Sequence, residues 1–194
     1  CPRLLLIPET VAEVRRRAFQ RPDALDAFAR AAEEAFADPL LFGPEPGIPY
    51  LARRALPHLA AAAVVLEDAR CADRARQGVE TLLRFPPEEW IARPHRPMRC
   101  DHAMLNAAAD VALAMDLCGQ FWPEGTRQDV AARLGEVVLV RFLETWRLQD
   151  AHWARPEYHW NWKIMCCGEA GLVALACREQ LADLPELLRA ALAG

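Results

Sequence analysis

The residues best suited to chemistry gather in one short stretch, between Trp146 and Lys163. Indole, imidazole, guanidinium and ammonium groups are denser there than the core of a plain helix requires. Asn161 adds an amide where an apolar helical pattern begins, and the first turn of a helix carries backbone N–H groups without partners. Because such a helix start attracts anions, we expect a polar, anion-binding site here. Its candidate residues are Trp153, Arg155, Tyr158, His159, Trp160, Asn161, Trp162 and Lys163.

The second half of this stretch has the spacing of a buried helix. Pro156 is acceptable in a first turn, where the missing N–H group costs nothing. From Asn161 onwards, one face repeats at intervals of three and four residues, and we expect that face to point inward and to carry the amide with it. The members of that face are Asn161, Met165, Gly168, Leu172 and Leu175.

Composition limits the class of protein. The chain has 194 residues, of which 53% are hydrophobic and 26% charged, enough for one soluble, globular domain with a core of its own. It contains no run of about 18 apolar residues, so we expect no membrane span. The net charge of −4 disfavours a nucleic-acid-binding surface. The opening CPRLLLIPET lacks both an initiator Met and an intact signal peptide, so we interpret the chain as processed or as part of a longer protein.

Cysteine usage indicates neither a disulfide framework nor a metal site. The seven cysteines include no CxxC pair, and most lie in apolar helical segments, where a thiol behaves as a small hydrophobic group. Cys100 and His102 have the spacing of two metal ligands, but no further ligands follow at a suitable distance. We therefore expect no metal and no cofactor. Cys166 and Cys167 lack the neighbouring base that a nucleophilic thiol requires.

Helical patterns follow one another along the whole chain, and no segment has a convincing strand pattern. Short turns separate most of them, which is typical of antiparallel helical hairpins. The longest pattern begins near Thr126, which we expect to be its N-cap. The predicted fold class is therefore all-α, an array of antiparallel hairpins. The expected helices cover residues 8–20, 22–37, 50–69, 71–85, 101–117, 126–148, a helix containing 161–175, and 184–193.

Two features precede or open the fifth helix. The irregular stretch Pro86–Arg99 carries Trp90 among basic residues, which is compatible either with a binding loop or with a solvated loop anchored by one indole. Asp101 and Asp116 bracket the apolar stripe of the helix that follows. An inward aspartate at a helix end commonly caps a neighbouring loop, and Asp101 is also a candidate substrate-binding residue.

Several of these segments resemble the heparinase II/III-like polysaccharide lyases. The run NWKIMCCG from Asn161 resembles a helix of their α/α toroid, although Lys163, Cys167 and Glu169 differ from the usual residues there. The opening residues 1–17 resemble the start of the same domain. Weaker likenesses cover residues 66–83 and 101–116. The resemblance implies that residues 1–194 form one toroid-like domain at the N-terminal side of a longer protein, followed in some relatives by a β-sandwich.

The same resemblance implies a reaction. Lyases of this kind cleave uronic-acid glycans by β-elimination, which requires neutralising the sugar carboxylate before a base removes the neighbouring proton. Asn161 is the candidate catalytic contact to that carboxylate, with the basic residues beside it, and the tryptophans are candidates for stacking on sugar rings. The catalytic Tyr of the family lies on a later helix, and Tyr158 does not match its position. We therefore expect this chain to bind an acidic polysaccharide without turning it over alone, in a periplasmic or secreted protein.

Two other classes of function stay open. A toroid glycosidase acting on unsaturated uronides would use paired carboxylates, for which the chain offers Asp101, Asp116, Asp150 and Glu157. A non-catalytic helical scaffold would bind a protein partner through an exposed apolar surface. The tryptophans also have an ordinary explanation, since most indoles in helical proteins pack between helices.

Overall fold

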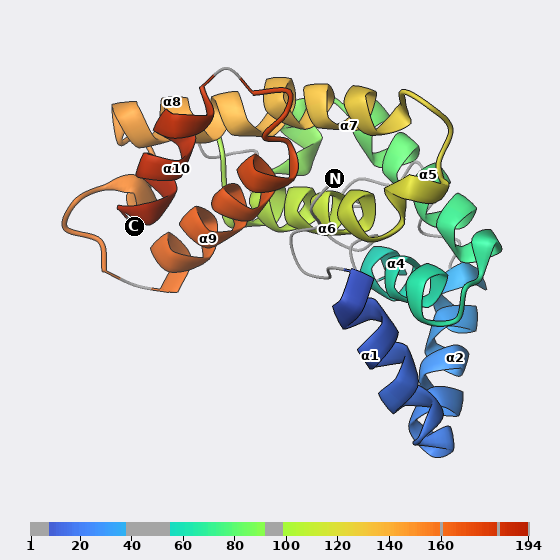
Figure 1. Ribbon diagram of the computed structural model, residues 1–194. Helices are drawn as coiled ribbons and strands as arrows, with labels where there is room; N and C mark the ends of the chain where they lie inside the picture. Colours follow the sequence, from blue (N-terminus) through green and yellow to red (C-terminus); the bar gives the residue numbers. More distant parts are fainter. Residues whose placement is uncertain (1–7, 38–54, 92–98, 160, 182, 194) are drawn as a thin grey trace.

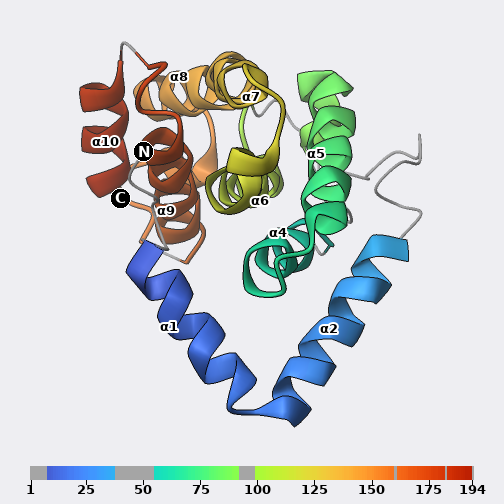
Figure 2. The same ribbon diagram turned by 45° about the vertical axis from the view of Figure 1, so that its right-hand side comes forward.

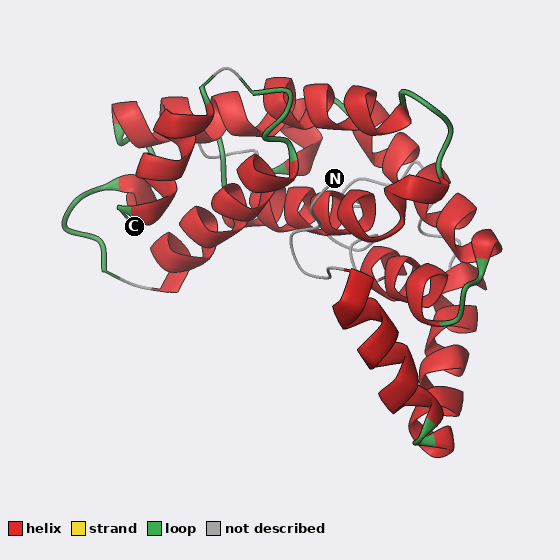
Figure 3. Ribbon diagram, viewed as in Figure 1, coloured by secondary structure: helices red, strands yellow, loops and turns green. Residues whose placement is uncertain are grey.

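The computed structural model describes residues 8–37, 55–91, 99–159, 161–181 and 183–193. Throughout those residues every regular element is a helix, which confirms the all-α prediction (Figure 3). The α-helices are α1 (Pro8–Phe19), α2 (Pro22–Ala37), α4 (Ala55–Val65), α5 (Ala69–Arg84), α6 (His102–Cys118), α7 (Thr126–Leu134), α8 (Val140–Leu148), α9 (Asn161–Ala176) and α10 (Leu184–Leu192). Short turns of other helical types are η2 (Pro87–Trp90), η3 (Gly119–Phe121), η4 (Gly135–Leu139) and η5 (His152–Ala154).

Local signals account for most helix starts. Pro8 and Pro22 open α1 and α2, and Pro57 lies in the first turn of α4, positions where a proline costs no hydrogen bond. Asp68 caps α5 by accepting from the backbone N–H of Arg70. Residues 39–49 and residues 50–54, the first part of the helix expected at 50–69, lie outside the described residues.

The turn between α4 and α5 confirms the predicted hairpin. Glu67 adopts the left-handed conformation, with φ 56°, which reverses the chain. Asp68 follows at once as the N-cap of α5. Glu67 and Asp68 therefore form the turn together: Glu67 reverses the backbone and Asp68 starts the next helix.

The predicted long helix 126–148 is present with two corrections. A π-helical turn, η4, interrupts it between α7 and α8. The N-cap is Gly125, not Thr126, because the backbone there has φ 86°, a conformation that glycine adopts without a Cβ penalty. The backbone N–H of Thr126 instead donates to the carbonyl of Pro123 at 3.2 Å.

α4, α6 and α9 run in the same direction through the middle of the molecule (Figures 1 and 2). His102 and Trp162, both in first turns, lie against each other, and Asn106 meets Glu169 further along the same pair of helices. α6 and α9 are therefore parallel. The Trp122 indole N–H donates to the carbonyl of Ala72 at 3.0 Å, which joins the end of α6 to the start of α5 and makes that pair antiparallel.

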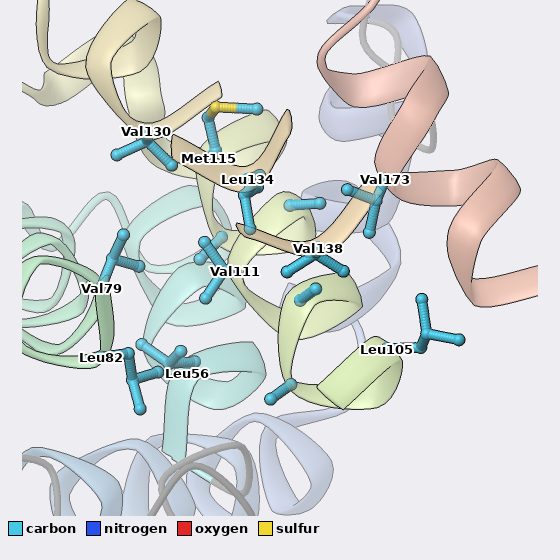
Figure 4. Close-up of a cluster of buried hydrophobic side chains, with 14 of the residues drawn as sticks. Leu56, Val79, Leu82, Leu105, Val111, Met115, Val130, Leu134, Val138 and Val173 are labelled. Atoms are coloured by element: carbon cyan, nitrogen blue, oxygen red, sulfur yellow. The ribbon is translucent and has the colours of Figure 1, made fainter. Parts of the chain in front are cut away.

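The buried side chains form one continuous cluster between this layer and the helices outside it (Figure 4). α6 is buried along most of its length, because α4 and α9 pack on its two sides and α7 with η4 covers it. Residues from α4, α5, α6, α7, η4 and α9 meet in this core: Leu56, Val79, Leu82, Val111, Leu134, Val138 and Val173.

α1 and α2 form a V that projects from this body (Figure 2). Arg15 joins α1 to the end of α4 by donating to the carbonyl of Val64 and pairing with Glu67 at 2.6 Å. Parallel inner helices with antiparallel outer ones would suit an arc of a toroid, but no closed ring is seen among the described residues. None of the described helices is both long and apolar enough to cross a membrane.

Candidate functional site

Four aromatic side chains meet where α6 and α9 begin. The indole of Trp162 lies 5.7 Å from the His102 imidazole in a stacked arrangement and 5.2 Å from the His152 imidazole in a tilted one. The His152 ring in turn meets the edge of Tyr158 at 5.1 Å. All four side chains are partly exposed. We call this group the aromatic cluster: His102, His152, Tyr158 and Trp162.

Trp153 holds the cluster in place. Its side chain is fully buried and stacks on Phe142 of α8 at 5.8 Å, with the two ring planes almost parallel. Its indole N–H donates to the carbonyl of Cys100 at 3.3 Å, two residues before His102. The predicted sugar-stacking role of Trp153 is therefore wrong, because a sealed indole offers no face to a ligand. It anchors the segment that carries His152.

Lys163 also holds the segment before α9 through contacts within the protein. Its side chain is only 7% exposed, and its ammonium group donates to the carbonyl of Arg155 at 3.2 Å and lies 5.5 Å from the Trp146 ring. Such a cation over an indole face is an attractive contact. Lys163 was predicted to bind substrate. Because its side chain is buried and engaged, it instead fastens the segment before Tyr158 to α9.

Asp101 is the N-cap of α6. Its side chain is 3% exposed and accepts from the backbone N–H of Met104 at 3.0 Å, so it is not placed as a direct contact to a ligand. Its effect is to start α6 at the residue that brings His102 to Trp162. Asp101 was expected to cap a neighbouring loop or to bind substrate, and it instead caps the helix that it opens.

A polar contact lies deeper between the two parallel helices. The side-chain amide of Asn106 donates to a carboxylate oxygen of Glu169 at 2.7 Å. Burial, followed by the nearby Glu169 charge, raises the pKa of the Cys166 thiol well above its usual range. Burial raises the pKa of Cys167 to about 11. Both thiols are therefore protonated near neutral pH and cannot act as nucleophiles.

Asn161 lies elsewhere than predicted. It is the first residue of α9, later than a start at Pro156 would give, and its side chain is exposed. Most of the predicted inward face is on the solvent side: Met165 is 38% exposed and Leu175 40%, whereas Leu172 is half-buried against the core. The packed face is the opposite one, because α6 and α10 contact the side that carries small residues. That buried face consists of Lys163, Cys166, Cys167, Ala170, Val173 and Ala174.

The remaining predicted residues fall into two groups. Arg155 and His159 are exposed on the segment leading into α9, close in sequence to Tyr158. Trp160 lies outside the described residues. The structure thus brings Trp162 and Tyr158 together and leaves Asn161, Arg155 and His159 at the surface beside them.

Sequence reasoning missed the two histidines of the aromatic cluster. His152 stood inside the chemically rich stretch, but nothing in its spacing linked it to a helix that starts nine positions later. His102 was considered only as a metal ligand with Cys100. In the described part of the chain, no group of three His, Cys, Asp or Glu residues could hold a metal ion.

The carboxylates proposed for a glycosidase do not pair. Asp101 and Asp116 stand at opposite ends of α6, about 22 Å apart at 1.5 Å per residue, whereas paired catalytic carboxylates lie roughly 5–10 Å apart. Asp150 is bound to Arg99 at 2.9 Å. Glu157 is exposed. The geometry therefore disfavours this mechanism.

The irregular stretch before α6 is anchored by its indole. Trp90 is 1% exposed, as an anchoring residue should be, and Arg99 reaches Asp150 and, at 3.7 Å, Glu144. Arg93, His95 and Arg96 lie outside the described residues.

Comparisons of this chain with protein-family models, with curated proteins and with solved structures find no match.

Proposed function

We propose that this chain binds a sugar acid of an acidic polysaccharide at the aromatic cluster, as the toroid-like part of a lyase that cleaves uronic-acid glycans by β-elimination. The observation that carries the proposal is the meeting of His102, His152 and Tyr158 around Trp162. The resemblance of the segments around Asn161 and at the start of the chain supports the same class.

The cluster has the chemistry that a uronate requires. Imidazole and phenol groups can donate hydrogen bonds to a carboxylate, and both can exchange protons with a sugar. α6 and α9 are parallel, so their positive ends lie on the same side of the molecule and favour an anion there. Arg155 and His159 add exposed basic groups next to Tyr158.

Two predicted roles change with the geometry. One face of the Trp162 indole is occupied by His102, so a sugar could stack only on what His102 and His152 leave uncovered. Asn161 is exposed beside Trp162, so it would contact a carboxylate at the rim of a surface site and not on the wall of a deep one.

The first experiment measures binding. The 194-residue protein is titrated with oligomers of glucuronate and of mannuronate, with a neutral oligosaccharide as the control ligand. We expect saturable binding of an acidic oligomer and at least a tenfold weaker affinity in His152→Ala and in Trp162→Ala. His58→Ala, an exposed histidine on α4, serves as the matched control and should bind as the wild type does. Equal affinity in all four proteins would contradict the proposed site.

A second experiment tests whether the 194-residue chain cleaves the glycan without the rest of the parent protein. The resemblance assigns the catalytic Tyr to a later helix, so we expect no ultraviolet absorbance of unsaturated uronides from the 194-residue protein. Absorbance that disappears in His152→Ala or Tyr158→Phe would instead show that the base lies in this chain.

A binding scaffold for a protein partner is the second candidate, and the outer face of α9 favours it. Ile164 is 66% exposed, and with Met165 and Leu175 it leaves an apolar surface on that helix. Exposed apolar surfaces of this kind are typical of interaction sites. Retained oligosaccharide binding in Ile164→Glu would separate this surface from the aromatic cluster.

A further inference from the structure

A cleft lies at the opposite end of the parallel helices, where α6 and α9 finish and α7 starts. Its volume is about 300 Å³. Its walls carry two guanidinium groups, several carboxylates, side-chain amides and one indole. The residues that matter to its chemistry are Asp116, Trp122, Arg127, Gln128, Arg178 and Glu179.

Arg127 is the cation of this cleft with which no described carboxylate forms an ion pair. Its side chain folds over Gly119 so closely that a Cβ built there would meet the Arg127 Cγ and Cδ atoms at 2.9 Å. Its Nε atom is sealed from solvent, yet no described residue accepts a hydrogen bond from it. A guanidinium stays charged at every physiological pH, and a buried donor without an acceptor is costly. The Arg127 side chain as a whole is half-buried and lines the cleft, so a ligand carboxylate there can pair with its positive charge.

The start of α7 adds further donors beside Arg127. Its N-cap is Gly125, which has no side chain to cap the first turn, and no side-chain cap is made there. Backbone N–H groups at such a start favour a negatively charged partner. Arg127 belongs to that same first turn, so its guanidinium and these N–H groups lie close together.

The other walls suit hydroxyl groups. Asp116 and Glu179 can accept hydrogen bonds from hydroxyls, and the Gln128 amide can both donate and accept. Trp122 is held in a fixed position by its bond to the Ala72 carbonyl and offers an apolar surface. Acidic walls around one free guanidinium favour a ligand with a single negative charge and many hydroxyls over a dense polyanion.

We infer that this cleft binds one small hydroxylated carboxylate, of the size of a single sugar acid, with its carboxylate on Arg127. The volume lies at the lower end of the range of about 300–1,000 Å³ found for small-molecule sites, which fits one sugar unit. The inference does not depend on the function proposed for the aromatic cluster, because the two sites lie at opposite ends of α6.

The test is a titration of the 194-residue protein with sodium glucuronate, followed by calorimetry or ligand-observed NMR, with glucose as the probe that lacks the carboxylate. We expect saturable glucuronate binding that is at least tenfold tighter than glucose binding. Arg127→Gln should weaken glucuronate binding at least tenfold. Arg133→Gln, a change of the same type two turns further along α7, should leave the affinity unchanged.

Two further variants keep the outcome decisive. Gly119→Ala pushes the Arg127 side chain aside and should also weaken glucuronate binding, which covers the case in which Arg127→Gln lowers stability. His58→Ala lies outside both the cleft and the aromatic cluster and should bind glucuronate as the wild type does. The inference is overturned by the absence of saturable glucuronate binding, by equal affinity in Arg127→Gln and wild type, or by an equal loss of binding in Arg127→Gln and His58→Ala.

Discussion

The two ends of the α6–α9 pair solve the same packing problem in different ways. At the starting end, aromatic rings contact one another, and Trp153 and Lys163 tie the connecting segment to the helices. At the finishing end, the chain leaves a cleft of about 300 Å³ with the charged Arg127 on its wall. The first end is organised by contacts between aromatic rings, whereas the second is an open cleft lined by charged and amide side chains.

The difference indicates at which end a bound ligand would add contacts that the protein itself does not make. Removing a ligand from the aromatic cluster leaves rings that still pack on each other. The cleft gains most from an occupant, because a ligand carboxylate there can pair with the charge of Arg127. The following changes probe each end, from the largest expected effect to the smallest.

Trp153→Ala should be the most damaging substitution at the starting end. It removes a fully buried indole, its stacking on Phe142 and its bond to the Cys100 carbonyl, so we expect a loss of about 3–5 kcal/mol in the free energy of unfolding. Urea denaturation followed by circular dichroism measures it. Trp162→Ala, which removes a half-exposed indole, should cost clearly less. A similar loss in both variants would show that Trp153 does not have the anchoring role assigned to it.

Buried thiols at both ends should make the protein less stable at high pH. Burial raises the pKa of Cys177, just beyond α9, to about 12, whereas a thiol in the unfolded chain titrates near about 8.5. The stability linked to this thiol is therefore fully present below about pH 8.5 and falls as the pH rises towards about 12. The expected slope is about 1.4 kcal/mol per pH unit for each such thiol.

The contribution of Cys177 can be isolated by comparing slopes. Unfolding free energies of wild type and Cys177→Ala are measured from about pH 8.5 to about pH 10.5, a range that lies below the folded pKa. The variant loses some stability at every pH, because the substitution removes a buried side chain, but its decline with pH should be shallower. Parallel declines would mean that the thiol titrates normally in the folded protein.

Asp101→Ala should cost about 1 kcal/mol, because it removes the cap that accepts from the Met104 backbone N–H. Asp101→Asn is the matched control, since asparagine caps helices about as well as aspartate. Thermal denaturation compares the three proteins. Two-dimensional NMR should show shifts at His102 in the alanine variant and much smaller ones in the asparagine variant. Equal destabilisation by both substitutions would point to the charge of Asp101 and not to its cap.

Glu186→Gln should have the smallest effect. The Arg147 guanidinium, through hydrogen bonds and charge, lowers the pKa of the Glu186 carboxyl, but the pair lies at the surface. Exposed ion pairs typically contribute little to stability because solvent screens them. We expect a small change in unfolding free energy that shrinks further at high salt. A larger loss would mean that this contact between α8 and α10 supports the starting end of α9.

Prediction from the sequence worked best for helix positions. α1, α2, α6, α9 and α10 lie where the three-and-four spacing, the prolines and the caps indicated, because those signals act between residues close in the chain. It failed at Gly125, where backbone conformation selected the cap. It also failed on α9, where apolar residues surround the helix and two opposite stripes share the same spacing.

The functional residues show the same division. The sequence alone marked the stretch from Trp146 to Lys163 as chemically rich, and Trp162 and Tyr158 both contact His152 there. Nothing local could indicate that His102, sixty residues before Trp162, would stack on it. Nor could it reveal that Lys163 would face Trp146 instead of a ligand.

Residue order by itself determined that the described part of the chain is helical, where most helices begin, and that the six cysteines there are buried without bonding to one another. Tertiary structure alone decided which side of α9 is packed, which rings share the cluster and where Arg127 lies without an acceptor. The physical reason is the sequence distance over which the two kinds of interaction act. Helix formation depends on neighbours within a few residues, whereas burial and ring contacts depend on which distant helices pack against each face.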